Sequence, residues 1–198
     1  MNHGCIKCDR INTNNKNWQE PTYGASQLYL AAERGSEYCV QYLLTCLGAN
    51  PNVRTFIGWT ALHIASQEGH DGCVTLLAAG NADLDLPLDN SNGSTAVILA
   101  CKNGHVNVLL ALLDAGADLH KTNAFGQSPA HIASQFGHVK CLLIIIARGG
   151  KYTLPDNQGV TPIDLAIIFE QPECVGVLLA RHAEWTTEFH FDYCLQQV

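Results

Sequence analysis

One alanine recurs along this chain at a nearly constant spacing. It stands at Ala31, Ala65, Ala100, Ala133 and Ala166. The intervals between these copies are 34, 35, 33 and 33 residues, and two of the stretches around them, "TALHIASQEGH" (60–70) and "SPAHIASQFGH" (128–138), differ at only four of eleven positions. Five units with one such period predict a solenoid, in which each unit packs only against its neighbours.

Each unit carries the signals of two short helices. A turn glycine is followed two residues later by a hydroxyl residue suited to cap a helix, namely Ser26, Thr60, Thr95, Ser128 or Thr161. Pro129 and Pro162 come next, at the first helical position, where a missing N–H costs nothing. A second glycine then ends the first helix, and an apolar run such as "VLLALLDA" begins the second. Each unit is therefore predicted to be a helical hairpin.

Composition excludes several classes of protein. The chain has 47% apolar residues, enough for a substantial core, and a net charge of −7, which offers no basic patch for nucleic acid. Its longest apolar run, 141–147, is too short to span a membrane, and its polar start lacks a signal peptide. We find no phosphate loop, paired carboxylates or nucleophile elbow. We therefore expect an intracellular, non-enzymatic protein without a cofactor, located in the cytoplasm, with the nucleus as a second compartment.

At this point the residues resemble a known family. The stretches "GWTALHIASQEGHDGCVTLLAAGNAD" and "GQSPAHIASQFGHVKCLLIIIARGG" closely resemble ankyrin repeats, and the resemblance runs from about Tyr23 to Glu184. It implies an all-α solenoid of stacked helical hairpins with β-turn finger loops. The expected organisation is a flexible or capping segment at 1–20, a repeat domain of five units at 21–184, and a tail at 185–198.

The paired histidines of the two similar stretches could suggest chemistry. A catalytic site would use His63 and His131, but the equivalent positions of the other units hold Tyr29, Ile98 and Asp164. The resemblance implies instead that both histidines form hydrogen bonds with the backbone within and between units. A further set after the turn glycine, His70, His105 and His138, is also predicted to be structural.

The nine cysteines do not form a disulfide framework in the sequence, and we expect reduced thiols. Four recur at one position of the second helix where unit three has Val108, which predicts a small buried hydrophobe: Cys39, Cys73, Cys141 and Cys174. Cys5 and Cys8 form half of a zinc site, but the other half is missing, so no metal is expected unless a partner supplies two ligands.

The resemblance implies a protein partner bound along a concave surface. The residues that line it, called the concave strip below, are Phe56, Ile57, Trp59, Gln67, Glu68, Lys102, Asn103, Phe125, Gln127, Gln135, Phe136, Ile168 and Phe169, together with Ser91, Asn92 and Val160. Large apolar groups at positions that the fold leaves free often mark interfaces. For Trp59 and Phe125 the alternative is that the ring packs against the neighbouring turn.

The predicted function is that of a monomeric adaptor that binds a protein of unknown identity. The alternative is a substrate-recruiting subunit of a ubiquitin ligase, although the tail does not resemble a SOCS box. The tail "EWTTEFHFDYCLQQV" either covers the exposed edge of unit five or is a partner motif. The resemblance also implies that Asn52 is a candidate for hydroxylation by an asparaginyl hydroxylase, with Asp85 and His120 at the equivalent positions.

Overall fold

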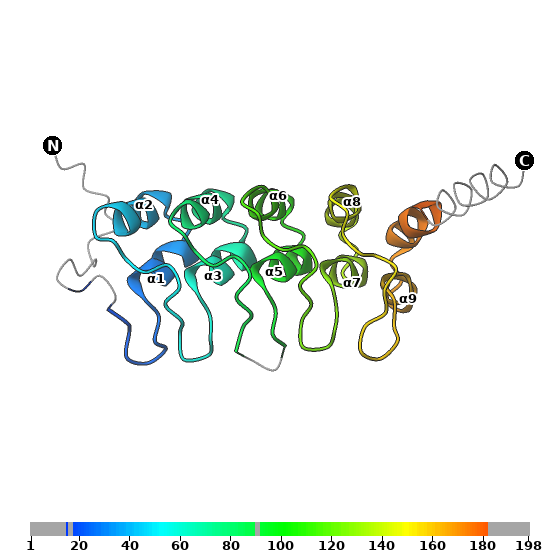
Figure 1. Ribbon diagram of the computed structural model, residues 1–198, viewed down its shortest axis with the longest axis horizontal. Coiled ribbons are helices and arrows are strands. Elements are labelled where there is room, and N and C mark those ends of the chain that lie inside the picture. The colour runs from blue at the N-terminus through cyan, green and yellow to red at the C-terminus, as the bar shows by residue number, and fades with distance from the viewer. Residues whose placement is uncertain (1–14, 16–17, 90–91, 182–198) are drawn as a thin grey trace, which may run out of the picture.

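The computed structural model describes residues 15, 18–89 and 92–181. Its helices form two parallel rows, with one helix of each unit in each row (Figure 1). The first row holds α1 (Gln27–Glu33), α3 (Ala61–Glu68), α5 (Ala96–Asn103), α7 (Pro129–Gln135) and α9 (Pro162–Ile168). The second row holds α2 (Glu37–Thr45), α4 (Asp71–Ala79), α6 (Val106–Asp114), α8 (Val139–Ala147) and the helical residues 172–181. The predicted all-α solenoid is confirmed.

The first helices begin where the hydroxyl residues predict. The side chain of Ser26 accepts a hydrogen bond from the backbone N–H of Tyr29 at 3.1 Å, which satisfies one of the unpaired donors at the start of α1. Thr60 and Thr161 cap α3 and α9 in the same way. Thr95 stands at the equivalent position of α5, but its side chain forms no capping bond.

The backbone turns left-handed after most of the helices, usually at a glycine, but at two helix ends the residue is not glycine. Gly35, Gly69, Gly104 and Gly137 all have positive φ after a first helix. In unit five the same position is Glu170, with φ 54°, a conformation that is unfavourable for a residue with a Cβ. Asn81 takes the same conformation after α4, as predicted from its repeat position, which is occupied by Gly116 in unit three.

The core runs through the whole stack between the two rows. Ala65, Ala100, Ala133 and Ala166, the repeated alanines of units two to five, are completely buried. Their small side chains let the first helices of successive units approach closely, while leucine, isoleucine and valine from the second helices fill the space between the rows. No helix in the described part of the chain is long and apolar enough to cross a membrane.

The repeated cysteines are part of this core, with one correction. Cys73, Cys141 and Cys174 are buried free thiols, and burial raises the pKa of Cys73 to about 11. Cys39, which is also buried, is disulfide-bonded, so the expectation of a reduced thiol is wrong at this residue. The repeat pattern gave no sign of this bond, because that pattern groups Cys39 with the buried thiols.

The described part of the segment before unit one contacts the stack. The side-chain amide of Gln19 donates to the carbonyl oxygens of Gly24, at 2.6 Å, and Arg54, at 2.8 Å, so it touches the first two finger loops. Cys5, Cys8 and the tail at 185–198 lie outside the described residues.

Candidate functional site

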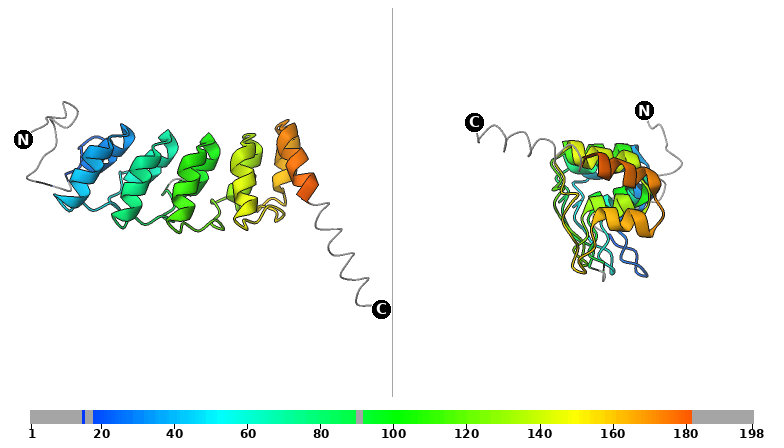
Figure 2. Two further views of the ribbon diagram at one scale, coloured as in Figure 1. Left: turned by 90° about the horizontal axis from the view of Figure 1, so that it is seen from above. Right: turned by 90° about the vertical axis from the view of Figure 1, so that its right-hand side faces the viewer.

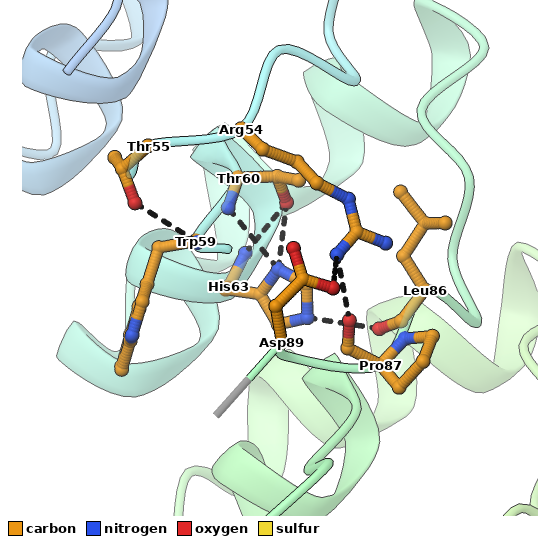
Figure 3. Close-up of polar contacts among 8 residues, drawn as sticks. All are labelled: Arg54, Thr55, Trp59, Thr60, His63, Leu86, Pro87 and Asp89. Atoms are coloured by element: carbon orange, nitrogen blue, oxygen red, sulfur yellow. Dashed lines mark hydrogen bonds and ion pairs between the residues drawn. The ribbon is translucent and has the colours of Figure 1, made fainter. Parts of the chain in front are cut away.

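His63, on α3, is bonded inside the stack through both ring nitrogens (Figure 3). Its Nδ1 accepts hydrogen bonds from the backbone N–H of Thr60, at 3.2 Å, and from the Thr60 hydroxyl, at 2.8 Å. Its Nε2 donates to the carbonyl oxygen of Leu86, at 2.9 Å, in the loop between α4 and α5. Because a carbonyl can only accept, these bonds require the neutral ring with its proton on Nε2.

The surroundings of His63 keep the ring uncharged. Burial lowers the pKa of His63 to about 4; the bond to Leu86 opposes this shift, and the nearby positive charge of Arg54 adds to it. Arg54 itself pairs with Asp89 and donates to the carbonyl oxygen of Pro87, so it joins the fingers of units two and three (Figure 3). A ring bonded on both sides has no free nitrogen for a metal or a nucleophile.

Unit four repeats this arrangement and unit five replaces it. The Nδ1 of His131 lies 2.8 Å from the Ser128 hydroxyl, and its Nε2 donates to the carbonyl oxygen of Val160 at 3.1 Å. Burial lowers the pKa of His131 as well. In unit five the Oδ2 of Asp164 accepts from the Thr161 hydroxyl at 2.6 Å and from its N–H at 2.9 Å. A carboxylate thus fulfils the capping role of the imidazole in unit five.

A second set of histidines precedes the second helices, at His70, His105 and His138. Each ring donates from Nε2 to a carbonyl oxygen at the end of the preceding unit's first helix, at 2.9–3.2 Å. Each ring also covers the turn glycine of that unit. Gly69 has φ 83°, and a Cβ built on it would lie 2.8 Å from the ring of His105. Glycine is therefore needed here for both backbone conformation and space.

The predicted structural role of the histidines is confirmed by these bonds. Within the described residues no group of three or more His, Cys, Asp or Glu side chains could hold a metal ion. A shallow groove of about 610 Å³ lies between α4 and α6. Half of its eight lining residues are alanine, and its one carboxylate, Asp114, is paired with Arg148 at 2.8 Å. The groove therefore does not bring catalytic groups together.

The concave strip contains most of the exposed large apolar side chains on the first row and its loops. The finger loops all project from the same side of the stack as the first row of helices (Figure 1), and they stand away from the helix pairs when the stack is seen end-on (Figure 2). The exposed apolar residues of the strip are Phe56, Ile57, Phe125, Phe136, Ile168 and Phe169. Glu68, Lys102 and Asn103 are also exposed, whereas Gln67 and Gln135 are half-buried. Ser91 lies outside the described residues.

Trp59 and Phe125 differ, although both stand beside a turn glycine. Trp59 is half-buried against the core, and its ring meets that of His63 edge-on at a centroid distance of 6.3 Å. Phe125 is 48% exposed. Trp59 therefore packs inside the protein, against the core and His63 rather than against the neighbouring turn, while the Phe125 side chain is exposed.

Gln127 and Lys102, two polar residues of the strip, contact side chains of neighbouring units. Gln127 donates to Asp156, at 3.4 Å, and accepts from Asn123, at 3.1 Å, so it connects the fingers of units four and five. The ammonium group of Lys102 lies 5.9 Å from the centroid of the Phe136 ring. Two neighbouring units thus place a cation beside an exposed aromatic ring.

One exposed aromatic side chain was missed by the sequence reasoning. Tyr23, 54% exposed, precedes the turn glycine of unit one, as Ile57 and Phe125 do in units two and four. The same spacing could have identified it, but the strip was mapped only from unit two onward. With Tyr23, the exposed apolar residues of the finger loops extend from unit one to unit four.

Asn52, the candidate for hydroxylation, connects two finger loops. Its Oδ1 accepts from the backbone N–H of Asp83 at 2.8 Å. Asp85 forms the equivalent contact one unit later, where its Oδ1 accepts from the N–H of Asp118 at 2.9 Å. At these two equivalent positions Asn and Asp each provide a side-chain oxygen that accepts a bond from the next finger loop.

Comparison with known proteins agrees with this architecture. Residues 28–123 and 112–188 match a family model described as ankyrin repeats in three copies. Among curated proteins, the transient receptor potential cation channel subfamily A member 1 of Homo sapiens is 38% identical over 91 residues, which is 46% of this chain and 8% of that protein. The B-cell lymphoma 3 protein homolog of Mus musculus is 35% identical over 94 residues, 46% of this chain and 21% of that protein. The chain thus matches only a small part of the length of these relatives.

Proposed function

The chain belongs to the ankyrin repeat family, and from this premise we propose that it is a non-enzymatic adaptor that binds a partner protein along the concave strip of units two to five. Ankyrin repeats are in general protein–protein interaction modules. The proposal for this chain rests on the chemistry of its own exposed side chains.

One observation carries the proposal most directly. Phe136, Ile168 and Phe169 stand at the ends of the first helices of units four and five and are 42%, 63% and 46% exposed. The positions equivalent to the two phenylalanines hold Glu68 and Asn103 in units two and three, so the fold itself does not require an aromatic residue there. Exposed aromatic side chains close together on one surface favour a binding role.

The neighbouring charge indicates the chemistry of the partner. Lys102 lies beside Phe136 and has no carboxylate within ion-pair distance among the described residues. A partner that buries the Phe136 ring would therefore meet a positive charge at its edge. A segment with apolar side chains next to a carboxylate fits both features.

We also propose that the protein acts as a monomer in the cytoplasm, with the nucleus as a second compartment. The net charge of −7 supports a partner other than nucleic acid, because a polyanion would be repelled.

The test is quantitative affinity purification with a double variant, Phe136→Ser with Phe169→Ser. If both rings are anchors that each contribute about 2 kcal/mol, the affinity for the partner should fall by roughly several hundredfold. The melting temperature should remain nearly unchanged, because exposed substitutions usually alter stability by less than about 0.5 kcal/mol.

A matched control replaces two exposed apolar residues of the second row, Tyr38→Ser with Leu143→Ser, which are 60% and 41% exposed. This control should bind the partner normally. Equal binding by the strip variant and the control, or a large fall in melting temperature for the strip variant alone, would show that the phenylalanines are not partner anchors. Ubiquitin-ligase subunits among the recovered proteins would favour the alternative function.

A further inference from the structure

The last unit differs from the others at a position that faces the next unit. In units one to four this position of the first helix holds a small, fully buried side chain: Ala32, Ser66, Cys101 and Ser134. In unit five the same position is Ile167, which is 59% exposed. An isoleucine on the last unit is thus more apolar, and far more exposed, than its counterparts inside the stack.

A position on the second helix shows the same change. Leu44 of unit one faces unit two, since a Cβ built on Gly80 would lie 2.9 Å from its side chain. The equivalent residues of units two to four are half-buried: Ala78, Leu113 and Ile146. In unit five the equivalent residue is Leu179, which is 55% exposed.

Together with Ile163 and Val175, these two residues form what we call the open face of unit five. Ile163 and Val175 are half-buried, although their equivalents in the inner units, among them Val97 and Leu142, are fully buried. Unit five is the last helix pair of the described stack (Figure 2). Terminal repeats that end in water usually carry polar residues on their outer side. The open face is apolar instead, which indicates that another surface covers it.

We propose that residues 182–198 of this chain cover the open face. The helical residues 172–181 contribute Val175 and Leu179 to that face, and the chain continues directly from residue 181. The segment that follows is rich in large apolar side chains: Trp185, Phe189, Phe191, Tyr193 and Leu195. The segment is therefore joined to the chain next to the open face, and its apolar side chains match the chemistry of that face.

Length and shape also support this occupant. A chain extends at most about 3.5 Å per residue, and packed helices lie about 8–10 Å apart, so roughly ten residues suffice to cross the two helices of unit five. A regular sixth repeat fits less well. The small residues equivalent to Ile167 allow successive first helices to approach closely, and an isoleucine there would hold a further first helix away.

The test is a double-mutant cycle in the full-length chain, with thermal unfolding as the measurement. One variant is Ile167→Ser, which restores the residue that Ser66 and Ser134 supply in the stack. The other replaces Trp185, Phe189, Phe191 and Tyr193 by serine. Each variant should lower the melting temperature by about 3–6 °C. The combined variant should melt no lower than the less stable of the two single variants, because both remove the same contact.

The matched control is Ile168→Ser, which changes an equally large and equally exposed neighbour on the concave strip. It should leave the melting temperature nearly unchanged. The proposal fails if Ile167→Ser behaves like this control, or if the two destabilisations add in full.

Two other outcomes would identify a different occupant. A dimer in sedimentation velocity that Ile167→Ser dissociates would overturn the proposal in favour of a second copy of this chain. Loss of partner recovery without a change in melting temperature would overturn it in favour of an external protein. The readout is the stability of the isolated chain, so the result is independent of the proposed function of the strip.

Discussion

The Nε2 of His63 lies 2.9 Å from the carbonyl oxygen of Leu86, and this single bond joins the first helix of unit two to the finger loop of unit three. The other ring nitrogen accepts from Thr60 and closes the cap of α3. Both contacts need the uncharged ring. The contact between units two and three through His63 therefore depends on pH.

We predict that the protein loses stability as the pH falls from about 6.5 towards 4. The pKa of His63 is lowered from 6.5 to about 4 in the folded protein, so the unfolded chain binds more protons in this window. The stabilisation is complete above the unfolded value, and a loss of about 3 kcal/mol develops as the pH falls to the folded value. Urea unfolding at a series of pH values measures it.

The control for this prediction is His63→Ile, which places the residue of unit three at this position. The variant should be less stable at pH 7, because Leu86 and Thr60 lose their partners, but its stability should depend less on pH. An equal slope in both proteins between pH 6.5 and 4 would mean that His63 is not the titrating group. His131, whose pKa is also lowered by burial, contributes in the same direction in both proteins.

We predict that two equivalent threonines respond differently to removal of their hydroxyl. Thr60→Val should cost about 1–2 kcal/mol, because the hydroxyl of Thr60 caps α3 and contacts His63. Thr95→Val should be neutral or stabilising. Unit three has Ile98 where unit two has His63, and the buried Thr95 hydroxyl has no hydrogen-bond partner among the described residues. Chemical unfolding of both variants tests this, and equal costs would contradict it.

We predict that Glu170→Gly stabilises the protein by about 0.5–1 kcal/mol. Glu170 has φ 54°, and a residue with a Cβ pays about 1–2 kcal/mol in this conformation, part of which the greater freedom of glycine in the unfolded chain offsets. The melting temperature should rise by roughly 1–4 °C. Glu170→Ala removes the charge but keeps the Cβ, so a similar rise in that variant would assign the effect to charge rather than to backbone conformation.

We predict that Asn52 accepts one oxygen atom when the protein is incubated with an asparaginyl hydroxylase, as measured by peptide mass. Asn52 is the asparagine among the three equivalent loop positions named above. Asn52→Asp is the matched control, because Asp85 forms the same contact with a carboxylate. The variant should remain folded but should gain no oxygen at this position. An unmodified Asn52 peptide from the native protein would contradict the prediction.

Much of the architecture could be predicted from sequence because its causes are local or periodic. A capping hydroxyl such as Ser26, a proline at the first helical position such as Pro162, and a turn glycine such as Gly69 act within a few residues of themselves. The roles of His63 and His131 were implied by the resemblance to ankyrin repeats. Both rings cap their own helix and donate to a carbonyl oxygen in the finger of the next unit, although the two acceptors, Leu86 and Val160, are not at equivalent positions.

The tertiary structure decided which side chains remain free, because exposure depends on residues about one period away. Trp59 follows its turn glycine and Phe125 precedes its own, but only Trp59 packs against the core. Gln127 was expected on the binding surface, and its contact with Asp156 in the next finger uses it internally. The exposure of Ile167 is likewise set by what lies beyond unit five, a packing relationship to which the repeat frame gives no guide.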